Sequence, residues 1–137
     1  MNESMVNSLC GIDSPWDRLI RIMSILRSPE GCPWDREQTH LSIRDNLKEE
    51  CGELLEAIDA NDGDGMREEL GDVLLQTVFH AQIAAETGRF TINDVLETLC
   101  EKLISRHPHV FGEGKALDAK EAIAFWKEAK NKEKGSA

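Results

Sequence analysis

The segment from Met66 to Thr87 constrains the fold of this chain more than any other part of the sequence. Projected at roughly 100° per residue, it forms one broad apolar face that includes Leu70 and Val73. A second apolar face includes Leu75 and Phe79. A helix that is apolar on both flanks has to be buried on both, and 137 residues are enough for only one compact domain. We therefore expect a second copy of the chain to complete the core.

Start and stop signals predict four more helices and no strands. They cover residues 14–27, about 41–59, 91–106 and 118 to about 130. The Pro- and Gly-rich segment 28–35 is expected to be an irregular loop, and 61–65 a turn. The chain has no Tyr and few aromatic residues, which disfavours a sandwich or a barrel. The expected fold is all-α, with about five helices forming a four-helix-bundle-type core completed by homo-oligomerisation.

The domain organisation follows from these signals, because no linker or internal repeat interrupts them. We expect an N-terminal extension over 1–13, one domain over 14–130 and a frayed tail over 131–137. The beginning of the chain lacks a basic region followed by an apolar segment, so we expect a cytoplasmic protein. Its four cysteines are scattered without a C-x-x-C pair and are expected to be isolated thiols.

The charge balance excludes several classes of partner. The formal net charge is −10, so the chain should repel polyanions, and we expect no binding to DNA, RNA or a membrane surface. A phosphate-rich ligand would require local positive charge, which metal ions held by acidic side chains can supply.

Acidic residues gather at one place on each of two predicted helices. Glu49, Glu50 and Glu53 occupy the run Glu-Glu-Cys-Gly-Glu, and Glu69 and Asp72 follow after a short predicted turn. Residues three apart are neighbours on a helix surface. Two antiparallel helices joined by that turn could bring the pairs face to face.

Converging carboxylates favour a divalent cation, because like charges and burial both raise their pKa. Oxygen ligands suit Mg²⁺ or Mn²⁺, and neither helix offers the Glu-x-x-His pair of a di-iron site. The spacing alone is equally compatible with an ordinary solvated acidic face. His80, two turns after Asp72, is expected to be a hydrogen-bonded buried histidine rather than a ligand.

Four blocks of this sequence, in order, resemble the MazG family of nucleoside triphosphate pyrophosphohydrolases. The resemblance covers about residues 15–130 and is closest to the first domain of two-domain members. The blocks are Cys32-Pro33-Trp34-Asp35 with Gln38-Thr39, Glu49-Glu50-x-x-Glu53, Glu69-x-x-Asp72 and Lys102-x-x-x-Arg106-His107-Pro108-His109-Val110-Phe111.

The resemblance implies an all-α homodimer or homotetramer that hydrolyses nucleoside triphosphates to monophosphate and pyrophosphate. The implied cofactor is Mg²⁺, with Mn²⁺ as a substitute. By motif position, Glu50, Glu53, Glu69 and Asp72 are its ligands, and Glu49 positions or deprotonates the attacking water.

The resemblance also implies a substrate-binding set on the later helices. Lys102 and Arg106 are one turn apart and would bind phosphate oxygens, although ordinary surface charge is the alternative. Trp126 would contact the base or sugar, with Lys130 assisting at a phosphate; a core position is the alternative for Trp126. Trp34 either stacks on a base or closes one end of the bundle.

A second hypothesis keeps the fold and the metal site without efficient catalysis. In that case the chain is a helical oligomerisation or nucleotide-sensing module. The hydrolase requires Glu49 and the basic residues for turnover, whereas the module does not.

Overall fold

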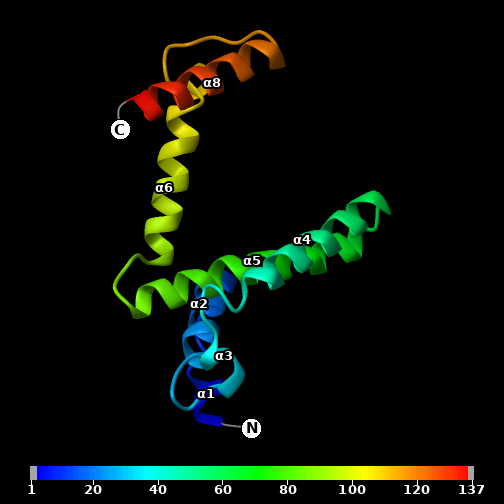
Figure 1. Ribbon diagram of the computed structural model, residues 1–137, viewed down its shortest axis with the longest axis vertical. Helices are drawn as coiled ribbons and strands as arrows, with labels where there is room; N and C mark the ends of the chain where they lie inside the picture. Colours follow the sequence, from blue (N-terminus) through cyan, green and yellow to red (C-terminus); the bar gives the residue numbers. More distant parts are fainter. Residues whose placement is uncertain (1–2, 136–137) are drawn as a thin grey trace. The chain divides into compact units, whose positions relative to one another are not determined.

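The computed structural model describes residues 3–135, and its regular structure there is entirely helical, which confirms the all-α prediction. Figure 1 follows the helices along the chain. They are α1 (Glu3–Asn7), α2 (Pro15–Leu26), α3 (Pro33–Glu37), α4 (Arg44–Asp59), α5 (Gly63–Glu86), α6 (Ile92–Ser105), α7 (Pro108–Phe111) and α8 (Ala119–Gly135).

Two predicted helix starts carry the side-chain caps that the sequence indicates. The Ser14 hydroxyl accepts a hydrogen bond from the Asp17 backbone N–H at 3.3 Å, and Pro15 begins α2. At the start of α8, an oxygen of the Asp118 carboxylate accepts from the Glu121 backbone N–H at 2.9 Å. Both caps satisfy backbone donors that the first helical turn leaves free.

The turn before α5 is shorter than predicted, because Gly63 and Gly65 already belong to the helix. The Asp62 carboxylate accepts a hydrogen bond from the Gly65 N–H at 3.0 Å and so caps the N-terminal end of α5. Asn61 adopts a left-handed conformation with φ 52°, which asparagine tolerates well and which reverses the chain direction.

The predicted boundaries change at two more places. The one-turn helix α3 overlaps the end of the segment 28–35 expected to be an irregular loop, because it begins at Pro33. The second predicted helix begins at Arg44 instead of Leu41, because Thr39 and Ser42 exchange hydrogen bonds between backbone N–H and hydroxyl groups at 2.8 and 3.1 Å. These bonds hold the preceding residues in a turn.

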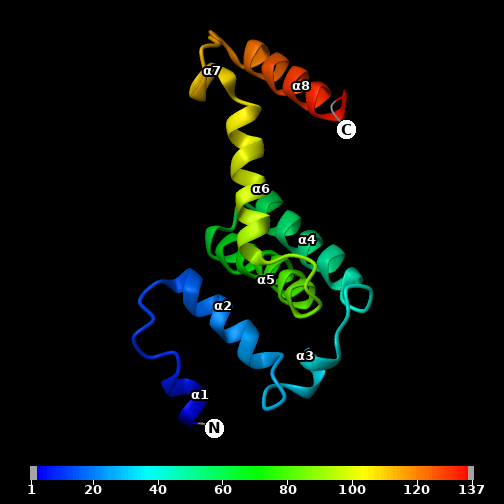
Figure 2. The same cartoon turned by 90° about the vertical axis from the view of Figure 1, so that its left-hand side faces the viewer.

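The chain divides into two compact units, one ending at Ile92 and one beginning at Asn93. In the first unit, α4 and α5 form a helical hairpin and α2 packs across α5 (Figure 2). The core of this unit is small and comes from α2, α5 and the residue that precedes α4. Its buried members are Met23, Ile43, Val78, Phe79 and Ile83.

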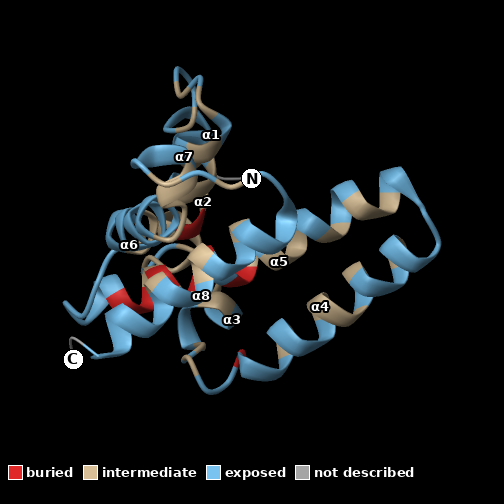
Figure 3. Ribbon diagram, turned by 90° about the horizontal axis from the view of Figure 1, so that it is seen from above, coloured by how far each residue is buried: buried red, intermediate tan, exposed pale blue. Residues whose placement is uncertain are grey.

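Burial along α5 is uneven. The buried residues lie between Gln76 and Ala84, whereas the half near the turn is exposed or half-buried (Figure 3). Leu55 on α4 is 59% exposed and Leu70 on α5 is 57% exposed. Completion of the core by a second copy stays a prediction, and these side chains are the ones that such a copy would cover.

The second unit contains α6, α7 and α8, and α7 packs against α8. Helix α8 extends to Gly135, while residues 136–137 of the tail expected to fray lie outside the described residues. The predicted domain limits stay predictions. Within residues 3–135, no helix has the length and apolar character needed to cross a membrane.

Candidate metal centre

The α4–α5 hairpin brings together the four carboxylates that the sequence singles out. Glu50 and Glu53 lie on α4, and Glu69 and Asp72 lie on α5. One oxygen from each of the four lies within 4.8 Å of the others. The i, i+3 spacing places each pair on one side of its helix, and the short turn sets the two sides against each other.

The electrostatics of the cluster oppose full ionisation. Burial raises the pKa of Glu69 to about 7, with further contributions from Glu53 and Asp72. Burial is also the largest cause of the raised pKa of Glu50, followed by its hydrogen bond to Glu53 and by the charges of Glu53, Asp72 and Glu49. Without a cation, Glu69 therefore retains its proton up to about neutral pH.

Two buried carboxylate oxygens indicate that the cluster fits a hard cation. The Oε2 atoms of Glu50 and Glu69 are buried and have no hydrogen-bond partner among the described residues. A buried acceptor without a donor is costly, and a cation satisfies several such oxygens at once. The donor set contains only oxygen, which is typical of Mg²⁺ and Mn²⁺ sites rather than zinc sites.

Glu49 lies beside this group but outside it. Its side chain is exposed on α4, and its charge contributes to the raised pKa of the adjacent Glu50. Its role toward an attacking water stays a prediction.

His80, two turns after Asp72 on α5, lies against a second histidine, His40. Nδ1 of His80 lies 2.8 Å from Nδ1 of His40, and the two rings are parallel. Burial lowers the pKa of His80, and so does the neighbouring His40. His80 is hydrogen-bonded, as expected, but it is half-buried rather than buried. Its partner comes from the segment between α3 and α4, which carries no sequence signal for this contact.

Arg106, a predicted phosphate ligand, is held by other residues of the second unit. Its side chain is 11% exposed, and its NH2 group donates to the Glu133 carboxylate at 2.9 Å. Its guanidinium carbon lies 4.7 Å from the centre of the Trp126 ring, a cation–π contact. The hydrogen bond from Arg106 is the largest cause of the lowered pKa of Glu133, and a second hydrogen bond, from Ser105, lowers this pKa further. No sequence signal indicated Glu133, which lies in the tail expected to fray.

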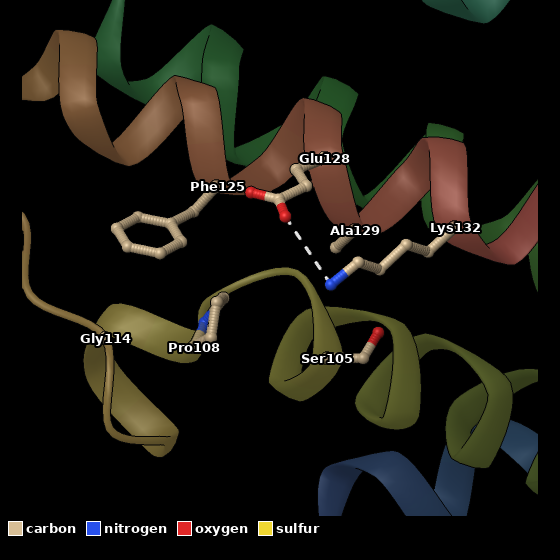
Figure 4. Close-up of a pocket in the computed structure, with 7 residues that line it drawn as sticks. All are labelled: Ser105, Pro108, Gly114, Phe125, Glu128, Ala129 and Lys132. Atoms are coloured by element: carbon tan, nitrogen blue, oxygen red, sulfur yellow. Dashed lines mark ion pairs between the residues drawn. The ribbon is translucent and has the colours of Figure 1, made fainter.

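The other predicted substrate residues have fewer contacts. Lys102 on α6 and Lys130 on α8 are exposed, and Trp126 is half-buried. A separate pocket of about 280 Å³ in the same unit contains none of the predicted site residues (Figure 4). Its lining residues are Ser105, Pro108, Gly114, Phe125, Glu128, Ala129 and Lys132.

Trp34 on α3 is 54% exposed and meets Phe79 edge-on, with ring centres 6.4 Å apart. Helix α3 is held by Arg27, which donates to the backbone carbonyls of Asp35 and Gln38 at 2.6 and 3.0 Å. Arg27 also donates two hydrogen bonds of 2.8 Å to Glu86 on α5. The exposure of about half of the Trp34 side chain is compatible with either role predicted for it.

Comparison with known proteins agrees with the all-α fold. The family model of the MazG nucleotide pyrophosphohydrolase domain matches residues 38–111. A crystal structure of a mazG-related protein from Thermotoga maritima superposes with a TM-score of 0.69 at 30% identity, covering 84% of this chain and 98% of that one. The class of protein is thus an all-α nucleotide pyrophosphohydrolase domain, and the chain belongs to the MazG family.

Curated relatives carry more specific names. The nucleoside triphosphate pyrophosphohydrolase/pyrophosphatase MazG of Thermotoga maritima is 59% identical over 120 residues, which are 88% of this chain and 46% of the relative. The nucleoside triphosphate pyrophosphohydrolase of Escherichia coli K12 is 49% identical over 119 residues, or 86% of this chain and 45% of the relative. This chain therefore spans less than half the length of these two relatives.

Proposed function

We propose that this chain is a Mg²⁺-dependent hydrolase of nucleoside triphosphates, with Mn²⁺ as a possible substitute. The products are a nucleoside monophosphate and pyrophosphate. The observation that carries the proposal is the group of four carboxylates within 4.8 Å, two of which have buried, unpartnered oxygens. The names of the curated relatives support the same reaction.

In this proposal, Glu50, Glu53, Glu69 and Asp72 hold the metal. When bound, Mg²⁺ neutralises the triphosphate and lowers the pKa of a coordinated water. Glu49 orients the attacking water and accepts its proton as the bond between the α- and β-phosphates breaks.

The proposed substrate-binding residues are those that the family resemblance indicates. Lys102 and Arg106 bind the phosphates, and Arg106 can offer two parallel N–H donors once Glu133 releases it. Trp126 and Lys130 contact the nucleoside, and Trp34 either stacks on the base or closes one end of the bundle. A hydrophobic base pocket separates close analogues weakly, so we propose a broad substrate range.

The proposed setting is cytoplasmic, where the activity would clean the nucleotide pool or lower a signalling nucleotide. The protein would act as a homodimer or homotetramer, with no DNA, RNA or membrane partner. The exposed leucines of the α4–α5 hairpin support the association of copies, and the net charge of −10 disfavours polyanionic partners.

A catalytically weak oligomerisation or nucleotide-sensing module is the second candidate. The pairing of Arg106 with Glu133 favours it, because a guanidinium already bound to a carboxylate is less available to phosphate. This candidate retains the metal site and the fold but requires no turnover.

Pyrophosphate release from a panel of canonical and damaged nucleoside triphosphates distinguishes the two candidates. We expect release with Mg²⁺, none with a chelator, and none from Glu53→Ala, whose helicity should match the wild type. Glu56→Ala is the matched control, because Glu56 is exposed on the same helix and lies outside the cluster. No release across the panel at high protein concentration would exclude the hydrolase and leave the module.

A further inference from the structure

Gln76 on α5 is a buried amide with an unsatisfied oxygen. It is 6% exposed, and its Oε1 atom is buried without a hydrogen-bond partner among the described residues. A buried acceptor loses its hydrogen bonds to water, and leaving it unpaired disfavours the folded state. A leucine would avoid this cost on a helix that is otherwise largely apolar, so the amide requires a donor that the described residues do not supply.

The position of Gln76 on the helix relates it to the carboxylate cluster. It follows Asp72 by four residues, so the two are neighbours one turn apart. On a helical wheel of α5, position 76 lies between positions 69 and 72. Long helical side chains lean toward the N-terminal end of their helix, so the amide of Gln76 leans toward the level of Asp72.

The groups around Gln76 limit which hydrogen-bond donors could reach its Oε1 atom. When a cation is bound, Glu69 and Asp72 are ionised and only accept hydrogen bonds. Nδ1 of His80, one turn further along α5, is engaged with His40. Mg²⁺ and Mn²⁺ sites built from a few carboxylates usually retain several waters, and water on a cation is a strong donor.

We propose that Gln76 is a positioning residue whose Oε1 accepts a hydrogen bond from a water molecule on the cation held by the four carboxylates. The inference rests on the metal site of the proposed function and concerns binding rather than turnover. Partners of this kind orient the coordinated groups and typically change metal affinity by about 10- to 100-fold when removed.

The test is a titration with Mn²⁺ alone, followed by electron paramagnetic resonance, on wild type and Gln76→Leu. We expect the Kd of Gln76→Leu to rise by about tenfold. We also expect its metal-free Tm to equal or exceed that of the wild type, because the unpaired acceptor is gone. A purely structural role for Gln76 predicts the reverse: a lower metal-free Tm and an unchanged Kd.

Gln82→Leu is the matched control, because Gln82 lies on the same helix and its amide donates to Glu86 at 3.2 Å. Its Mn²⁺ Kd should stay at the wild-type value. If Gln76→Leu does not fold, Gln76→Met, which keeps the unbranched shape, replaces it. Water-proton relaxivity counts the waters on the bound Mn²⁺, and this count should not rise in the variant.

Three outcomes overturn the inference. An unchanged Kd in a folded Gln76 variant removes the role of Gln76 and leaves the proposed hydrolase intact. A gain of one coordinated water in the variant would place the amide oxygen directly on the metal, contrary to the water-mediated contact. Absence of saturable Mn²⁺ binding to the wild type removes both this inference and the metal site of the proposed function.

Discussion

The two units of this chain handle charge in opposite ways. In the first unit, four carboxylates converge, and burial together with mutual repulsion raises the pKa of Glu50 and Glu69. In the second unit, the Glu133 carboxylate receives hydrogen bonds from Arg106 and Ser105, and its pKa is lowered. The first cluster is incomplete without an added cation. In the second, both oxygens of Glu133 are paired within the unit, and only the Nε atom of Arg106 is left buried without a hydrogen-bond partner among the described residues.

This difference separates a site built for a ligand from a contact that stabilises the fold. A buried group whose charge is opposed by its surroundings is a candidate functional residue. A group that is already paired and hydrogen-bonded must break those contacts before it can bind a ligand. This distinction matters most for Arg106. The family resemblance implies that Arg106 binds the substrate, whereas in the structure it is paired with Glu133.

The largest expected effect is on catalysis in the first unit. Asp72→Ala removes one of the four cation ligands, and pyrophosphate release should fall to background. Its metal-free Tm should not fall, because one of the mutually repelling carboxylates is gone. Coupled detection of pyrophosphate and thermal melts in chelator measure the two effects. A variant that keeps more than about a tenth of the wild-type rate would contradict the assignment of Asp72 as a ligand.

A smaller effect is expected in the second unit. Arg106→Ala should raise KM for nucleoside triphosphates by about tenfold or more, since a hydrogen bond between charged groups contributes about 1.5–3 kcal/mol. Lys127→Ala, an exposed change on α8, should leave KM unaltered. Steady-state kinetics of both variants decide the point. An unchanged KM in Arg106→Ala, with a lower Tm, would assign Arg106 to the Glu133 contact alone.

The smallest expected effect is the pH dependence of stability. Because the pKa of Glu69 rises from its ordinary 4.5 to about 7 in the folded chain, the folded state holds a proton that the unfolded state has lost. The contribution of Glu69 to stability is thus present at low pH and is lost as the pH rises from about 4.5 through about 7.

Thermal melts in chelator between pH 5 and about pH 8 should therefore show a wild-type Tm that falls relative to that of Glu69→Gln. The difference between the two proteins isolates Glu69 from other titrating groups, including His80, whose lowered pKa acts in the opposite direction. Saturating Mg²⁺ should remove the relative fall, because the cation stabilises the ionised cluster. Parallel Tm curves for the two proteins in chelator would contradict the raised pKa.

Local sequence signals predicted much of this structure. Ser14 and Asp118 cap helices where their spacing indicates, and the i, i+3 acids of α4 and α5 meet because a short turn joins the two helices. These features depend on a few neighbouring residues and on helical geometry.

Features that depend on distant parts of the chain were not predictable in this way. Glu133 meets Arg106 across 27 residues, and His40 meets His80 across 40. Neither contact leaves a periodic pattern, because each depends on how helices and loops pack. The start of α5 was also missed, because the Asp62 cap outweighs the low helix propensity of Gly63 and Gly65.

The central claim is that the carboxylates of the α4–α5 hairpin form a cation site, and calorimetric titration of Mg²⁺ near neutral pH tests it most directly. Run in two buffers of different ionisation enthalpy, the titration reports both binding and the protons released. The account predicts saturable binding with proton release, and a smaller release in Glu69→Gln because the wild-type carboxyl titrates at about 7. An absence of saturable Mg²⁺ binding would contradict it.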